Sequence, residues 1–149
     1  MSTMQIAKIR DVKTPVRGTP FSAGLDFFVP RDFPGEHYLL PGYAINIPSG
    51  IKVKVPHGFA LIFKNKSGVA VKRGLQVGAC VVDEDYQGEV HLHVRNISPD
   101  IQTITPGEKL VQAVLVPVEY CCVEVVDVDK LYEEKTERGE GGFGSTGTN

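Results

Sequence analysis

An aspartate and a tyrosine lie close together in the segment Val81-Val-Asp-Glu-Asp-Tyr-Gln-Gly-Glu89. Acidic residues are common in tight turns, which accounts for Glu84 and Asp85 without any function. Asp83 and Tyr86 are less well explained in that way, because together they could hold a sugar and a water molecule. A carboxylate directly after a buried strand can order a nucleophilic water. Phosphoryl transfer depends mostly on positioning and charge stabilisation, so a base with an ordinary pKa of about 3.9 would suffice.

The C-terminal segment Arg138-Gly-Glu-Gly-Gly-Phe-Gly-Ser-Thr-Gly147 is rich in glycine and has a single aromatic residue. Such a composition predicts a segment that is mobile when nothing is bound. One interpretation is a frayed terminus. The alternative is a lid in which glycine N–H groups form an anion nest and Phe143 stacks on a flat ring. In that case Arg138, Ser145 and Thr146 would contact phosphate oxygens.

Three further segments carry weaker signals. Lys64-Asn-Lys-Ser-Gly68 opens a predicted short helix at Ser67–Arg73, with the serine as its N-cap. A helix N-terminus attracts anions, although a plain capped helix with solvated lysines is the commoner structure. Pro106-Gly-Glu-Lys-Leu-Val-Gln112 places a glutamine within an apolar strand, as a satisfied core amide or as a ligand. Ser22-Ala-Gly-Leu-Asp26 is a short turn that leads into a strand.

The elements that must position these residues are strands, because apolar residues recur with period two. Ile51–Val55 and Val90–Val94 alternate strictly, as half-buried antiparallel strands do. Other candidates, rich in Val, Ile and Phe and separated by Gly, Pro, Asn and Asp turns, are Leu25–Val29, Tyr43–Ile47, Phe59–Phe63, Ala79–Val82, Leu110–Val116 and Cys121–Val128. Many short strands at this spacing predict an all-β sandwich, barrel or jelly roll with one short helix.

Composition narrows the functional class. A chain of 149 residues predicts one domain, and a net charge of −2 without a basic stripe argues against a nucleic-acid partner. We expect no secretory signal, because the first ten residues contain no apolar h-region, and no membrane span, because no apolar run approaches about 18 residues. Cys80, Cys121 and Cys122 form a poor disulfide framework and suit the cytoplasm. Zinc is not favoured, because His91 and His93 alternate along a strand without a second ligand pair.

The five segments occur in one order along the chain: Ala23–Asp26, Lys66–Gly68, Gly78–Gly88, Gly107–Gln112 and Arg138–Gly147. Their order and spacing resemble the five motifs of the trimeric dUTP diphosphatase (dUTPase) family, and the resemblance covers nearly the whole chain. The third and fifth motifs are the most specific. The resemblance implies a jelly-roll-like distorted β-barrel over residues 1–137. It also implies a flexible Gly-rich tail over residues 138–149 that closes the active site.

The resemblance further implies a homotrimer with shared active sites. Such an enzyme hydrolyses dUTP to dUMP and diphosphate with Mg²⁺, which lowers dUTP and supplies dUMP for dTTP synthesis. Asp83 is the implied catalytic residue that orders the attacking water, and Tyr86 packs under the deoxyribose, where a 2′-hydroxyl would clash. The implied nucleoside contacts are Ala79, Cys80, Val81, Val82, Tyr86 and Phe143. The implied phosphate contacts are Lys66, Ser67, Gly68, Gln112, Arg138, Gly144, Ser145 and Thr146. Asp26 matches an acidic residue linked to magnesium through water, while triphosphate oxygens and waters coordinate the ion directly.

Three positions depart from the family pattern. Lys66 and Lys109 stand where arginine is usual, and a lysine keeps the charge but loses the bidentate fork. Cys80 stands where many members have glycine in the base-reading hairpin. Readout of the base by main-chain groups can survive this last change.

Two other functions stay open at this point. One is a dCTP deaminase-like enzyme, which shares the fold but does chemistry on the base. The other is a non-catalytic jelly-roll module with a binding or structural role. The Phe143 tail and the pair of Asp83 and Tyr86 favour the diphosphatase, and release of diphosphate as opposed to ammonia separates the two enzymes.

Overall fold

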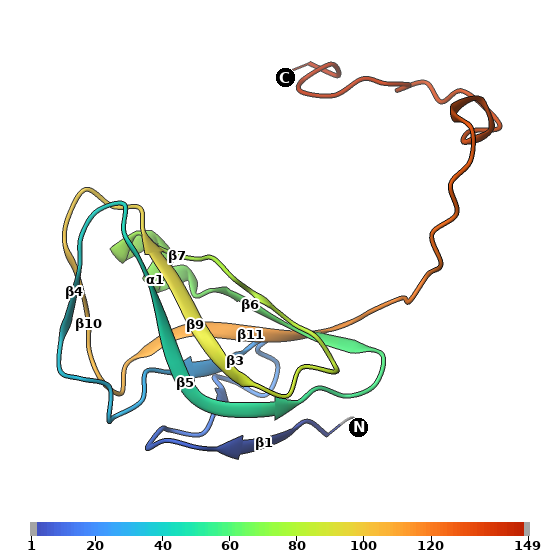
Figure 1. Cartoon of the computed structure of the whole chain (residues 1–149). Helices are drawn as coiled ribbons and strands as arrows, with labels where there is room; N and C mark the ends of the chain where they lie inside the picture. Colours follow the sequence, from blue (N-terminus) through green and yellow to red (C-terminus); the bar gives the residue numbers. More distant parts are fainter. Residues whose placement is uncertain (1–2, 148–149) are drawn as a thin grey trace. The chain divides into compact units, whose positions relative to one another are not determined.

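The computed structural model describes residues 3–147 and divides into two compact units, Met1–Glu119 and Tyr120–Asn149. The first unit holds all the strands of the described chain (Figure 1). In chain order the elements of this unit are β1 (Gln5–Lys8), β2 (Val16–Arg17), β3 (Leu25–Phe28), β4 (His37–Leu39), β5 (Ala44–Lys54), β6 (Phe59–Asn65), α1 (Ser67–Arg73), β7 (Leu75–Val77), β8 (Val81–Val82), β9 (Glu89–Asn96), β10 (Gln102–Ile104) and β11 (Lys109–Pro117).

The strands form three antiparallel sheets. Their strand orders are β1-β5-β9-β7, β2-β3-β11-β6-β8 and, for the small third sheet, β10-β4. In Figure 1, β5 and β9 run side by side, and β11 belongs to the other large sheet. The all-β, jelly-roll-like prediction is confirmed, although the described sheets do not close into a continuous barrel.

The core lies between the two larger sheets. Alternate residues of β9 (Val90, Leu92 and Val94) are buried, while the histidines between them are only half-buried. The opposite sheet contributes Phe27 and Phe63, whose rings meet edge to face with centroids 4.9 Å apart. This one-sided burial produces the period-two pattern that predicted the strands.

Two predicted strands, Tyr43–Ile47 and Ile51–Val55, are parts of one long strand, β5. The intervening Pro48-Ser-Gly segment is not a turn but a shift of register, between Pro48 and Lys52, in the ladder with β9. Gly50 has φ 75°, a conformation that favours glycine. The chain therefore bends without leaving the sheet.

The predicted helix is confirmed as α1, but its predicted N-cap is wrong. Lys66 occupies the N-cap position with extended backbone and no side-chain cap, and Ser67 is already the first helical residue. Gly74 ends the helix with φ 62°, and its N–H donates to the carbonyl of Ala70. This left-handed end is the usual way for glycine to stop a helix.

The prediction of a strand at Cys121–Val128 is wrong. The described part of the second unit contains a single short 3-10 helix, η1 (Val128–Lys130), and no strand. Val123 and Val125 are about nine-tenths exposed, at 89% and 93%. The alternation is strand-like, but a strand needs a neighbouring ladder, and this segment has none within the described chain. None of the helices in residues 3–147 has the length and apolar character needed to cross a membrane.

Candidate active site

A cavity of about 270 Å³ opens between β5, β6 and the segment that joins β7 to β9. Six residues predicted from the sequence line it: Ala79, Cys80, Val81, Val82, Asp83 and Tyr86. The structure therefore gathers the whole predicted nucleoside and catalytic set of the first unit around one space. The remaining lining residues, which the sequence did not single out as ligands, are Asn46, Phe63, Glu89, Val90 and His91.

The cavity lies where the chain crosses from one large sheet to the other. β7 pairs with β9 in the first sheet, whereas β8 pairs with β6 in the second. Between these strands, the carbonyl of Cys80 accepts a hydrogen bond of 2.7 Å from the N–H of Phe63. Residues 78–80 thus link the two ladders, and Ala79 and Cys80 of this link line the cavity.

Two carboxylates line the cavity, but only one is available for chemistry. The Glu89 carboxylate accepts hydrogen bonds from Arg10 Nε at 2.7 Å and from the N–H of Gly50 at 2.8 Å. The hydrogen bond from Arg10 lowers the pKa of Glu89 below its usual value. The Asp83 side chain is exposed and has no hydrogen-bond or ion-pair partner within residues 3–147. Asp83 is therefore the carboxylate of this cavity that can accept a hydrogen bond from a water molecule.

Tyr86 is fixed in place by the turn that carries it. Its hydroxyl donates to the carbonyl of Glu89 at 2.9 Å, and its N–H donates to the carbonyl of Asp83 at 3.2 Å. A Cβ at position 88 would overlap the tyrosine ring, so glycine is required there. The ring remains 44% exposed and can still pack against a ligand.

Glu84 ties the same loop to the turn between β5 and β6. Its carboxylate accepts the N–H of Gly58 at 2.8 Å and lies 2.7 Å from Nδ1 of His57. The hydrogen bond with Glu84 raises the pKa of His57 above its usual value. Glu84 therefore restrains the loop that holds Asp83, in keeping with its expected turn role.

A second cluster gathers predicted phosphate and metal residues around Asp26. This carboxylate is buried, with Lys66 on one oxygen and Lys109 Nζ 3.1 Å from the other. Burial alone would raise the pKa of Asp26, but hydrogen bonds from the two lysines outweigh it and lower the pKa below its usual value. With two lysines for one carboxylate the cluster has a net positive charge, which suits an anionic ligand.

This pairing predicts an acid-sensitive stability difference. Because the folded-state pKa of Asp26 is lowered, its contribution is present above the unfolded pKa of about 3.9 and is lost as pH falls through the folded value. Asp26→Asn should therefore lower the free energy of unfolding by about 2 kcal/mol at pH 7. Urea denaturation at pH 7 and near pH 3 should show this difference shrinking in acid. An equal difference at both pH values would contradict the assigned ion pairs, and exposed Asp100→Asn is the matched control.

Gln112 and the start of α1 border this cluster. Gln112 lies opposite Asp26 in the ladder of β11 with β3 and donates to the carbonyl of Asn65 at 2.9 Å. A Cβ at position 24 would overlap the Gln112 side chain, so Gly24 is needed for this close approach. The predicted phosphate residues of the first unit, Lys66, Ser67, Gly68 and Gln112, thus come from adjoining segments. None of these four residues lines the cavity that holds Asp83.

The predicted tail residues lie in the second unit. Arg138, Ser145 and Thr146 line one open hollow there, and Arg138 Nε donates to the carbonyl of Gly141 at 2.9 Å. Phe143 is fully exposed and has φ 50°, the one positive φ of a non-glycine residue in the described chain. Gly144 follows it with φ 91°. The tail therefore presents an aromatic ring next to turns rich in backbone N–H groups.

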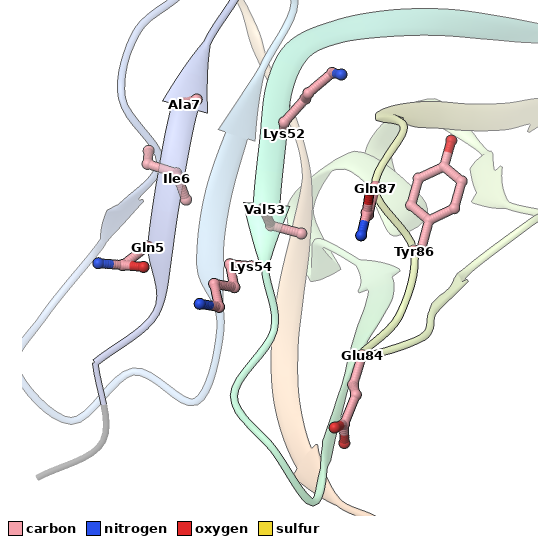
Figure 2. A pocket seen from close by; sticks show the side chains of 9 residues that line it. All are labelled: Gln5, Ile6, Ala7, Lys52, Val53, Lys54, Glu84, Tyr86 and Gln87. Carbon is pink, nitrogen blue, oxygen red and sulfur yellow. The ribbon is translucent and has the colours of Figure 1, made fainter.

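A larger groove of about 730 Å³ runs beside β1 and β5 and shares Tyr86 with the smaller cavity (Figure 2). Its charged side chains do not converge: Figure 2 shows Lys52 and Lys54 extending to opposite ends, with Glu84 directed away from both. A binding site needs polar groups that meet at one ligand. The smaller cavity, which brings Asp83 and Tyr86 together, is therefore the stronger candidate for the chemistry.

The described residues do not form a set of side-chain ligands that could surround a magnesium ion. No group of three or more His, Cys, Asp or Glu side chains in residues 3–147 converges on a possible metal position. Each oxygen of Asp26 is already in contact with an ammonium group. Direct ligation of an ion by Asp26 would first require one of these ammonium groups to move away.

An all-β fold with one free carboxylate in a small cavity, and a separate cationic cluster, fits a hydrolase of anionic nucleotides. The dUTPase family model matches residues 10–147, and the chain belongs to this family. A deoxyuridine 5′-triphosphate nucleotidohydrolase of Fusobacterium nucleatum is 37% identical over 151 residues, covering 99% of each chain. The enzyme of the same name from Candida glabrata is 38% identical over 134 residues, covering 89% of this chain and 88% of its own.

Solved structures share the fold. The dUTPase of Staphylococcus bacteriophage 80alpha, determined with dUpNHpp, has a TM-score of 0.82 at 23% identity and covers 99% of this chain and 100% of its own. A mutant dUTPase from phage phi11 of S. aureus, described with a structural Mg(II) ion, has a TM-score of 0.74 at 22% identity. It covers 85% of this chain and 97% of its own.

Proposed function

We propose that this protein is a dUTP diphosphatase that hydrolyses dUTP to dUMP and diphosphate. The observation that carries the proposal is the match of the dUTPase family over residues 10–147, with Asp83 and Tyr86 of its motif in one cavity. The products would lower the dUTP concentration and supply dUMP for dTTP synthesis.

Asp83 orders the attacking water in this proposal. Its carboxylate has no partner within the described chain, whereas Glu89 in the same cavity is held by Arg10 and the N–H of Gly50. The water attacks the α-phosphorus, its proton passes to the Asp83 carboxylate, and diphosphate leaves. Main-chain groups of residues 79–82 bind the uracil, and Tyr86 packs under the deoxyribose.

The phosphates bind the cationic groups in this scheme. Lys66 can exchange Asp26 for phosphate oxygens, and Ser67, Gly68 and Gln112 add polar contacts at the same place. The tail contributes Arg138, Gly144, Ser145 and Thr146. A magnesium ion bound with the triphosphate would neutralise charge on the leaving diphosphate. Asp26 is the residue that would hold the ion through water, once Lys66 has moved from its carboxylate.

We further propose a homotrimer with shared active sites, because the nucleoside cavity and the cluster around Asp26 have no lining residue in common. One subunit would supply the cavity, a second the cluster, and a third the tail of residues 138–149. Mixing Asp83→Asn subunits with subunits that end at Glu137 should restore part of the activity, since each mutant supplies what the other lacks. No recovery after confirmed subunit exchange would contradict shared sites.

Sugar discrimination should depend on Tyr86. Tyr86→Ala removes the ring beneath the deoxyribose and opens space for a 2′-hydroxyl, so we expect UTP hydrolysis to rise relative to dUTP by about tenfold. The measurement is the ratio of kcat/KM for the two nucleotides. Tyr86→Phe keeps the ring and should keep most of the discrimination. An unchanged ratio in Tyr86→Ala would place discrimination elsewhere.

A nucleotide panel tests the proposed reaction. The protein is incubated with dUTP, UTP and the four standard deoxynucleoside triphosphates, with and without magnesium, and both diphosphate and ammonia are quantified. We expect diphosphate from dUTP with magnesium and little product from the other nucleotides. Ammonia from dCTP would indicate a deaminase, and no turnover of any nucleotide would indicate a binding or structural module.

We also propose that the enzyme acts in the cytoplasm. Cys80, Cys121 and Cys122 are all free thiols, and a reducing compartment keeps them so. Fractionation of expressing cells with an antibody to the chain tests this placement. Recovery of the chain in the cytoplasmic fraction is the expected result.

A further inference from the structure

We propose that His93 is a positioning residue for Gly78–Cys80, the segment that leads into the base-reading residues 79–82, acting as a hydrogen-bond acceptor through Nδ1. This inference rests on the proposed function, because it concerns the main-chain groups that would read uracil. His93 lies on β9, and the hydrogen bond from Ala79 to its ring joins positions 14 residues apart in the chain. His93 itself does not line the cavity, but its ring contacts Ala79, which does.

His93 contacts the segment twice. Its carbonyl accepts the N–H of Gly78 at 3.0 Å, which extends the ladder of β7 with β9 by one residue. Its ring Nδ1 lies 3.1 Å from the N–H of Ala79. Because a backbone N–H can only donate, Nδ1 must be the acceptor and carry no proton. The neutral ring with its proton on Nε2 is the form that makes this bond.

The bond from Ala79 to the His93 ring replaces the backbone hydrogen bond that a neighbouring strand would otherwise provide. At Gly78 the chain leaves the first sheet, and at Val81 it enters the second as β8. The N–H of Ala79 therefore lies beyond the end of the β7 ladder, and the His93 ring supplies its acceptor. On the far side, the carbonyl of Cys80 accepts from Phe63. These bonds fix the direction of the main chain between residues 78 and 80.

The packing of the ring is equally restrictive. A Cβ at position 78 would overlap the His93 ring, so the ring lies directly against the glycine backbone. Asn46, which lies opposite His93 in the ladder of β5 with β9, lines the cavity beside Ala79 and Cys80. The His93 ring therefore sets both the hydrogen bonding and the spacing of the segment. A side chain without an acceptor at this position would release Ala79.

Three substitutions of His93 test whether its hydrogen-bond acceptor matters or only the volume of its side chain. His93→Leu removes the acceptor, His93→Asn offers an amide oxygen near the position of Nδ1, and His93→Gln offers polar atoms nearer the position of Nε2. We expect His93→Leu to raise KM for dUTP about tenfold, with a smaller change in kcat. His93→Asn should stay within about threefold of wild type, whereas His93→Gln should resemble the leucine variant. Exposed His37→Leu, on β4, is the control for loss of a histidine.

Amide hydrogen exchange at Ala79 tests the bond without reference to activity. We expect faster exchange in His93→Leu and near wild-type exchange in His93→Asn, with folding checked by circular dichroism. Unchanged exchange and KM in His93→Leu would overturn the inference. Equal losses in the leucine and asparagine variants would also overturn it, because an acceptor would then not matter. If the wild type fails to hydrolyse dUTP, the proposed function fails, and the exchange rates still decide whether Nδ1 holds Ala79.

Discussion

Asp83→Asn is expected to lower kcat for dUTP at least about 100-fold while leaving the dissociation constant for the nucleotide nearly unchanged. Asparagine keeps the size of the side chain and one oxygen, but the amide is a far weaker base for the attacking water. The loss should be large because the other carboxylate of the cavity, Glu89, is already bound by Arg10. No second free carboxylate is therefore present among the described residues that line this cavity.

Steady-state kinetics and calorimetry with a non-hydrolysable dUTP analogue measure the two quantities separately. Asp85→Asn is the matched control, because Asp85 is exposed in the same turn and does not line the cavity. A turnover within threefold of wild type in Asp83→Asn would exclude Asp83 as the residue that orders the water.

Ending the chain after Glu137 is expected to abolish nearly all turnover without unfolding the first unit. Residues 138–147, the described part of the removed segment, form no strand, and Phe143 is fully exposed. The melting temperature should therefore stay within a few degrees of wild type. The truncation removes the stacking ring, the Arg138 charge and the Ser145 and Thr146 hydroxyls. Base–aromatic stacking alone contributes about 1–3 kcal/mol per base. A truncated chain that retains full activity would show that the tail is not a lid.

Tryptophan fluorescence can follow the tail directly, because the chain contains no tryptophan. In Phe143→Trp the single indole should be in solvent in the empty enzyme and stacked on uracil in the closed one. A non-hydrolysable dUTP analogue with magnesium should change the emission strongly and saturably. dUMP should change it weakly, because it lacks the phosphates that recruit the tail. An analogue that binds by calorimetry but leaves the emission unchanged would contradict stacking by Phe143.

The long strands could be predicted from the sequence because one-sided burial leaves a period-two pattern, as in Val90–Val94. Very short strands such as β2 and β4 could not, because two or three residues are too few to show a period. At Cys121–Val128 the same pattern predicted a strand that the structure does not contain. There the alternation exists, but the described chain provides no strand to pair with it.

Part of the candidate site could also be predicted from the sequence, and part could not. Asp83 and Tyr86 could be singled out because they lie in one continuous turn, so their spacing in sequence approximates their spacing in the fold. The ion pair of Lys109 with Asp26 and the bond from Ala79 to His93 join distant positions. Their partners depend on strand register, which a single sequence does not specify.

Hydrolysis of dUTP in water enriched in oxygen-18 tests the central claim most directly. If an Asp83-ordered water attacks the α-phosphorus, mass spectrometry should find one labelled oxygen in dUMP and none in the diphosphate. The label should enter at the same position, but far more slowly, with Asp83→Asn. Label in the diphosphate would mean attack at the β-phosphorus, and ammonia release without dUMP would mean chemistry on the base. Either result would contradict the proposed mechanism.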